Sequence, residues 1–184
     1  MDWVGLQSAQ GAGCASKWRT LLLCLVFLIA SPPSFAEDAY QIKAAFIFNF
    51  TKFIVWPEAM EQEGGELRLC LFDSNPFGEY VYQLEGRKVR NFYLRIVQPE
   101  SFQQLTVCHI IYLSQTKTDQ KLLSGIADLP VLTIADADGF AQQGGGIELL
   151  SENNRIRFDV NLERIKSSGL DISSKLLHLA RQVY

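Results

Sequence analysis

Residues 107–113 read VCHIIYL, a stretch in which every residue except the histidine is apolar. A continuous apolar run of this length is typical of a strand that is buried on both faces of a parallel sheet. Residues 131–135 read VLTIA and have the same character, and residues 119–126 between the two runs have a helical pattern. This alternation of buried strand and helix predicts an α/β domain with a mostly parallel sheet.

The residues before this stretch extend the same pattern. Apolar side chains recur at helical spacing over residues 40–56, which predicts a long first helix that ends at Pro57. Residues 67–72, LRLCLF, predict a strand, and residues 77–84 predict a short helix after a turn. Residues 89–97 alternate between apolar and polar side chains, so a further strand is expected there.

The residues after the stretch predict a hairpin and two helices. Residues 147–150 and 155–160 alternate on either side of a polar turn, as in a β-hairpin. Residues 161–168 predict a helix that Gly169 terminates, and a last helix is expected in which one face carries Leu176, Leu177, Ala180 and Val183. The predicted fold is a three-layer α/β sandwich with a mostly parallel sheet, one antiparallel hairpin and helices on both faces.

The first 36 residues have the pattern of a secretory signal peptide. A basic segment precedes the apolar residues 21–30, LLLCLVFLIA, and Ser-Phe-Ala at 34–36 supplies small residues for cleavage after Ala36. The alternative is a permanent membrane anchor, but this apolar run is shorter than the roughly 20 residues that a bilayer requires. We therefore expect a signal peptide at 1–36 and a single domain at 37–184.

Cleavage at this point leaves two of the four cysteines, Cys70 and Cys108. An even pair of thiols that reaches an oxidising compartment is more often a disulfide than two free groups. A disulfide between these two residues is therefore expected.

The composition argues against several classes of function. The net charge of −3 does not favour nucleic-acid binding, which needs a concentrated basic surface. Cys108 and His109 are neighbours on a predicted strand, so their side chains point to opposite faces and do not form a catalytic dyad. Asp136 and Asp138 flank a turn, and a turn formed by Asp and Gly explains them without a metal. No catalytic, cofactor-binding or metal-binding residue is predicted.

Five separated motifs, taken in order, resemble the YfiR family of small periplasmic proteins. The resemblance covers essentially all of residues 37–184. Its motifs are IKAAFIFNFTKFIVWP (42–57), FDSNPFG (72–78), CHIIYLS (108–114), PVLTIADADGFAQQGGGIELL (130–150) and RIRFDVNLERIKSSGLDISSKLLHLARQVY (155–184).

This resemblance implies a regulatory protein of the periplasm rather than an enzyme. Characterised members of the family repress an inner-membrane diguanylate cyclase by acting on its periplasmic domain, and so lower cyclic di-GMP. They are linked to an outer-membrane lipoprotein, and members can form homodimers. The resemblance also implies a bridge at the positions of Cys70 and Cys108. A second bridge known in the family has no counterpart here, because no cysteine follows Cys108.

The C-terminal segment offers a candidate surface for a partner. Ile172 and Leu179 fall off the apolar face of the predicted last helix and lie near Lys175, a composition expected at an interaction patch. The partner-binding residues are therefore predicted to be Ile172, Lys175 and Leu179. The alternative is that the two apolar residues only complete the core.

A different class of function also fits the sequence. Residues 136–146 follow a predicted central strand at its carboxyl end, which is where open α/β sheets usually bind ligands. A small-ligand-binding module that uses this rim as its pocket is the alternative to the regulatory protein.

Overall fold

The computed structural model describes residue 1 and residues 35–60, 65–114 and 119–184. The chain divides into residues 1–34 and a folded unit, residues 35–184. The predicted signal peptide lies almost entirely outside the described residues. Within the described ranges, no helix combines the length and the apolar character needed to cross a bilayer.

The folded unit alternates strands with short helices. The α-helices are α2 (Phe35–Thr51), α3 (Gln120–Gly125), α4 (Leu162–Ser167) and α5 (Ser174–Leu177). The 3₁₀-helices are η1 (Glu58–Met60), η2 (Gly78–Leu84) and η3 (Phe102–Val107). The strands are β1 (Ile54–Val55), β2 (Gly65–Phe72), β3 (Lys88–Val89), β4 (Phe92–Val97), β5 (Ile110–Leu113), β6 (Leu132–Ala135), β7 (Ile147–Glu152), β8 (Arg155–Val160), β9 (Asp171–Ile172) and β10 (Gln182–Val183).

An eight-stranded sheet has the order β10-β8-β7-β6-β5-β2-β4-β3. The five strands from β7 to β4 in this order pair in parallel. β7 and β8 form the predicted antiparallel hairpin, and β3 pairs antiparallel with β4 at one edge. The prediction of a mostly parallel sheet with an antiparallel hairpin is confirmed.

Alternate residues of each central strand point to opposite faces of this sheet. On one face, Leu69 of β2 and Tyr112 of β5 pack in a core with Phe50 of α2; we call this the α2 face. On the other, Cys70 and Ile111 pack in a second core, which we call the disulfide face. Both faces are buried, and this explains why the strands lack a polar side.

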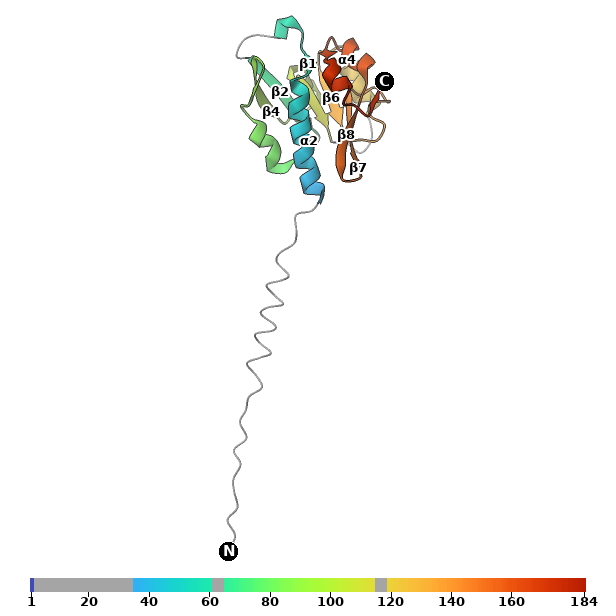
Figure 1. Cartoon of the computed structure of the whole chain (residues 1–184). Coiled ribbons are helices and arrows are strands. Elements are labelled where there is room, and N and C mark those ends of the chain that lie inside the picture. Colours follow the sequence, from blue (N-terminus) through green and yellow to red (C-terminus); the bar gives the residue numbers. More distant parts are fainter. Residues whose placement is uncertain (2–34, 61–64, 115–118) are drawn as a thin grey trace. The chain divides into compact units, whose positions relative to one another are not determined.

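Helices cover both faces, which confirms the predicted sandwich. Helix α2 crosses the front of the sheet in Figure 1. Buried residues of η2, α4 and α5 belong to the same core as α2, while buried residues of η3 and α3 belong to the core of the disulfide face. These residues are Val81 and Leu84, Ile165, and Leu176 on the α2 face, and Leu105, Leu122 and Leu123 on the disulfide face.

The first helix is shorter than predicted at its C-terminal end. It stops at Thr51, whose hydroxyl donates a hydrogen bond of 2.6 Å to the carbonyl of Phe48. The β-branched residues Ile54 and Val55 then form β1 and pair antiparallel with β9. A strand partner more than a hundred residues away, and not Pro57, therefore decides where the helix ends.

The last helix is also shorter than predicted. Helix α5 ends at Leu177, and the chain then runs into β10, which pairs in parallel with β8. The backbone N–H groups of Arg181 and Tyr184 donate to carbonyls of β8. The prediction that Ala180 and Val183 continue a helical face is therefore wrong, because the final residues form a strand.

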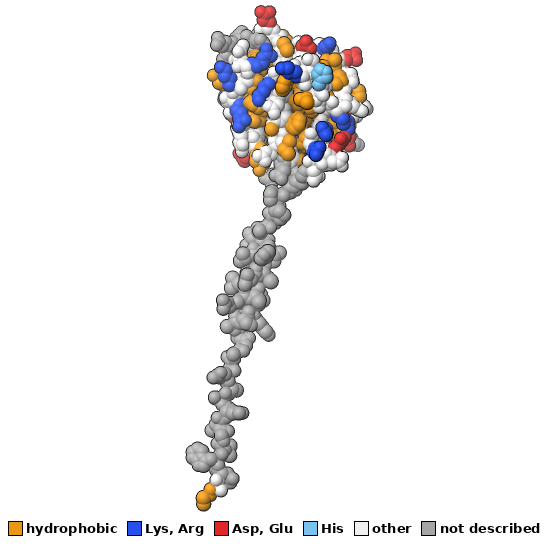
Figure 2. Space-filling view, in the orientation of Figure 1, with side chains coloured by type: hydrophobic (Ala, Val, Ile, Leu, Met, Phe, Trp, Pro, Cys, Tyr) orange, Lys and Arg blue, Asp and Glu red, His pale blue; other side chains and the backbone are white. Residues whose placement is uncertain are grey.

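The surface over α2 has a mixed character. Figure 2 shows apolar side chains running through the middle of this face with Lys and Arg side chains on both sides. Phe48 is half-buried, and the cations of Lys52 and Arg87 lie 4.5 Å and 5.6 Å from its ring centre. Phe46 packs against Phe50 and Phe158. Contacts within the domain thus account for both aromatics.

Candidate partner-binding surface

The C-terminal segment, residues 169–184, begins where α4 ends. Gly169 has a φ of 72°, in the left-handed region that favours glycine, and this terminates the helix. Ser173 then caps α5, because its hydroxyl accepts a hydrogen bond from the backbone N–H of Lys175. These local signals set where α5 begins, and its buried residue Leu176 packs in the core of the α2 face.

Ile172 is not part of the exposed surface. Only 6% of the residue is exposed, and it packs in the core of the α2 face. It lies in β9 directly opposite Ile54 of β1, ahead of the helix on which the prediction placed it. The expectation that Ile172 is exposed is therefore wrong, because strand pairing and not helical periodicity sets the direction of its side chain.

Leu179 and Lys175 are exposed as expected. Leu179 is 67% exposed, the highest value for a large apolar residue in the described domain, residues 35–184. Lys175 is exposed on α5, one helical turn earlier. Val183 and Tyr184 at the end of the chain are also exposed, at 46% and 39%. We call Lys175, Leu179 and Val183 the C-terminal patch.

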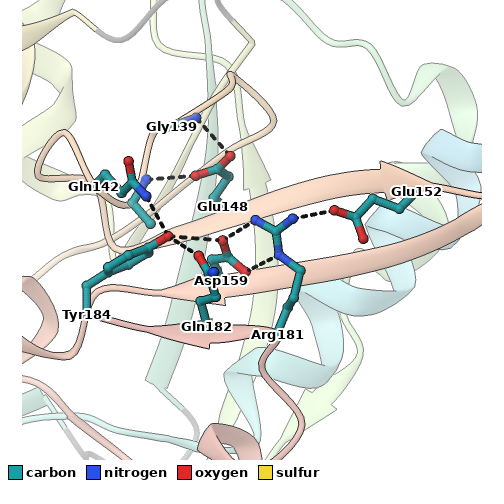
Figure 3. A network of polar contacts seen from close by, with 9 residues as sticks. Gly139, Gln142, Glu148, Glu152, Asp159, Arg181, Gln182 and Tyr184 are labelled. Carbon is teal, nitrogen blue, oxygen red and sulfur yellow. Dashed lines mark hydrogen bonds and ion pairs between the residues drawn. The ribbon is translucent and has the colours of Figure 1, made fainter.

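A polar network fixes the residues that follow Leu179 (Figure 3). The guanidinium of Arg181 donates to both carboxylate oxygens of Asp159, at 2.9 Å and 2.6 Å, and it also contacts Glu152. The Tyr184 hydroxyl accepts a hydrogen bond of 2.8 Å from the Gln142 side chain and contacts Gln182. The network ties β10 to the β7–β8 hairpin.

Asp159 is the buried member of this network, with 1% of the residue exposed. A buried carboxylate is stable only when its charge is paired and hydrogen-bonded, and the bidentate contact with Arg181 meets both needs. The hydrogen bond to Asp159 is the main reason that the pKa of Arg181 lies above its ordinary value. The end of the chain is thus held in one geometry.

The predicted disulfide is present. Cys70 of β2 and Cys108, which follows η3, are bonded with their Cα atoms 5.9 Å apart. Both residues are buried in the core of the disulfide face. The bond joins a central strand to the segment that precedes the next strand, and it leaves no free thiol at either position.

His109 has a structural role. Its Nδ1 accepts a hydrogen bond of 2.9 Å from the backbone N–H of Arg68. Burial, together with the positive charge of Arg68, holds the pKa of His109 below its ordinary value, so the ring is neutral at neutral pH. Because Cys108 is bonded to Cys70, the neighbouring pair has no nucleophile to activate.

A buried ion pair joins α2 to the end of β6. Lys43 Nζ lies 2.6 Å from a carboxylate oxygen of Asp136, and the side chains are 8% and 15% exposed. Tyr112 is fully buried, and burial first and the charge of Asp136 second raise its pKa. Sequence reasoning missed this pair, although Lys43 interrupts the apolar helix face that contains Ile47 and Phe50.

Residues 136–146 form a packed loop. Phe140 is fully buried, and a Cβ atom on Gly145 would overlap its ring. The buried carboxylate of Glu148 accepts hydrogen bonds from the backbone N–H groups of Gly139 and Ala141, at 2.9 Å and 3.1 Å. The glycines therefore serve close packing around Phe140, whose ring fills the space inside this rim.

The comparison with protein families agrees with this arrangement of elements. A family model described as YfiR/HmsC-like matches residues 40–181, from α2 to the arginine of the polar network. At the level of the family, the match supports a regulatory protein of the periplasm that acts on a diguanylate cyclase. Since the match covers most of the sequence, the chain belongs to the YfiR/HmsC-like family.

Proposed function

We propose that this protein is an exported repressor, without catalytic activity, that binds the periplasmic domain of an inner-membrane diguanylate cyclase and lowers cyclic di-GMP. The family match over residues 40–181 carries this proposal. The disulfide between Cys70 and Cys108 supports it, since such bonds persist in oxidising compartments.

The proposed mechanism is a shift between two states of the cyclase. A periplasmic protein does not meet the GTP of the cytoplasm, so its effect must pass through a partner that crosses the membrane. Binding changes the activity of that partner only if it prefers the inactive state to the active one. The repressor therefore needs a surface that recognises one conformation of the periplasmic domain.

We place that surface at the C-terminal patch. Leu179 presents an apolar side chain beside the charge of Lys175, and Val183 adds exposed apolar area. The contacts of Arg181 with Asp159 support this choice, because a surface that is already fixed loses less conformational entropy on binding. Ile172 pairs with Ile54 and is buried in the core of the α2 face, so it supports the segment and does not touch the partner.

Export and further partners belong to the same proposal. The signal peptide at 1–36 would be removed in the periplasm, so the mature chain would begin at Glu37; the intact mass of the periplasmic protein tests this point. An outer-membrane lipoprotein is proposed as a further partner, and the protein is proposed to form a homodimer.

The direct test is deletion of the gene followed by measurement of cyclic di-GMP. The proposal predicts a rise in cyclic di-GMP and in surface attachment, because the cyclase is released from its inactive state. In a strain whose cyclase carries an inactivated catalytic domain, the same deletion should have no effect. Unchanged cyclic di-GMP in the first strain contradicts the proposal.

A further inference from the structure

A pocket of about 440 Å³ opens at the carboxyl edge of the sheet. It is lined by residues 71–74 at the end of β2 and by residues 98–100 directly after β4. It is separate from the C-terminal patch and from the packed loop at 136–146. Its volume is within the range of about 300–1,000 Å³ that small-molecule sites occupy.

The topology explains why a hollow forms here. After β2 the chain crosses the α2 face through η2, whereas after β4 it crosses the disulfide face through η3. The two connections leave neighbouring parallel strands toward opposite faces, and the edge between them is left uncovered. In open α/β sheets, ligands bind in such crevices at the carboxyl ends of the strands.

Hydrogen bonds fix both walls of the pocket. On the side of β5, the hydroxyls of Ser74 and Ser114 lie 2.7 Å apart, and the backbone N–H of Ser74 donates to Ser114 at 3.1 Å. On the opposite wall, the backbone N–H of Glu100 donates to the side-chain oxygen of Gln104 at 2.7 Å. Both loops are thus held in place without a ligand.

The charge of the lining has a single sign. Asp73 and Glu100 are the acidic side chains of the lining; both are exposed, and neither forms an ion pair with another residue in the described ranges. Ser74 and Gln98 add neutral hydrogen-bonding groups, and Phe72 and Pro99 add a smaller apolar area. The pocket therefore favours a small ligand that carries a positive charge.

The number of oxygen ligands distinguishes an organic cation from a metal ion. Calcium takes about six to eight oxygen ligands, usually with several carboxylates among them. The described part of the chain contains no group of three or more His, Cys, Asp and Glu side chains that could hold a metal. An ammonium group, in contrast, is satisfied by two carboxylates and one neutral acceptor.

We propose that this pocket binds a small organic ammonium compound, held between the carboxylates of Asp73 and Glu100. This site goes beyond the regulation of the cyclase and does not depend on it. The binding experiment uses the purified mature protein alone, so its failure leaves the proposal for the cyclase untouched.

Calorimetric titration with 2-phenylethylammonium chloride tests the site, with 2-phenylethanol as the uncharged counterpart of the same size. We expect saturable binding of the ammonium probe that weakens with added salt, and affinity for the alcohol lower by about tenfold or more. The variant Asp73→Asn/Glu100→Gln should bind the ammonium probe about tenfold more weakly or not at all. Asn suits position 73, where φ is 77°, because it tolerates the left-handed region.

The matched control is Asp138→Asn/Glu163→Gln, which removes two exposed carboxylates away from the pocket and should leave binding unchanged. The single variant Glu100→Gln repeats the test if the double variant does not fold. Absence of saturable binding, equal affinity for the alcohol, or an unchanged affinity of the pocket variants overturns the proposal. Displacement of the probe by calcium chloride at an equal concentration also overturns it.

Discussion

The two faces of the sheet are held by different chemistry. On the disulfide face, a covalent bond links β2 to the segment before β5. On the α2 face, the Lys43–Asp136 pair joins α2 to the end of β6. At the edge of the sheet, Arg181 pairs with Asp159 and joins the end of the chain to β8, on the side of the strand opposite Phe158 and Val160. A covalent bond depends on the redox state of the compartment, while ion pairs depend on single side chains and on pH.

This difference bears on function because the C-terminal patch begins on α5, which packs on the α2 face. The covalent bond stabilises the fold as a whole, whereas the polar contacts fix the geometry of particular segments. Substitutions on the α2 face should therefore affect both stability and regulation, and reduction of the disulfide should affect mainly stability.

Reduction of the disulfide should have the largest effect on stability. Closing a loop of 38 residues stabilises the fold by about 4 kcal/mol in the chain-entropy model. Urea denaturation of the mature protein with and without a reductant measures the change. The variant Cys70→Ala/Cys108→Ala in the oxidised state should match the reduced protein; equal stability of the oxidised and reduced forms contradicts this prediction.

Loss of the Lys43 charge should have the next largest effect on the free energy of unfolding. Lys43→Met leaves the carboxylate of Asp136 without its cation in a mostly buried position, which should lower the free energy of unfolding by about 3 kcal/mol. Lys166→Met removes an exposed lysine from α4 and serves as the control, with an expected change below about 0.5 kcal/mol. Similar denaturation midpoints for the two variants would show that the ion pair does not stabilise the fold.

Removal of Arg181 should have a smaller effect on stability. Arg181→Ala leaves the buried carboxylate of Asp159 without its main donor, but the arginine itself is partly exposed, so we expect a loss of about 2 kcal/mol. Hydrogen exchange should also become faster in β10, and the amides of β5 should keep their protection. Arg155→Ala, which removes an exposed arginine of β8, should change neither quantity.

The smallest effect concerns alkaline pH. Burial raises the pKa of Tyr112 above its ordinary value of about 10, so the unfolded chain releases this proton first as the pH rises. Its contribution to stability is present below about pH 10 and is lost above it. Tyr112→Phe should reduce this loss of stability at alkaline pH at little cost at neutral pH, because the hydroxyl makes no hydrogen bond of good geometry among the described residues, although the carboxylate of Asp136 is near enough to raise its pKa. Tyr93→Phe, at an exposed position, should leave the loss of stability at alkaline pH unchanged.

The sheet could be predicted from the sequence because its signal is local. The apolar runs at β2, β5 and β6 are continuous, and their alternation with helical patterns is sufficient to indicate a parallel sheet. The glycine after α4 and the cap of α5 were also local signals. The disulfide followed from the number of cysteines and from the predicted export.

The ends of two helices could not be predicted, because distant partners decide them. Ile54 and Ile172 face each other across β1 and β9, and β10 pairs with β8. Helical periodicity gives no sign of these contacts, and for this reason Ile172 was placed on the surface. The partners of Lys43 and Arg181 are also distant in sequence. The one local sign of such a contact is the charge of Lys43 on the otherwise apolar face of the first helix.

The most direct test of the proposed repression is the Leu179→Asp variant in a strain that lacks the chromosomal gene. We predict a periplasmic level like that of the wild type, because Leu179 is 67% exposed, together with cyclic di-GMP as high as in the deletion strain. Val107→Asp, at an apolar position that is 49% exposed outside the C-terminal segment, should restore low cyclic di-GMP. Low cyclic di-GMP with a well-expressed Leu179→Asp variant would contradict the proposal that the C-terminal patch binds the cyclase.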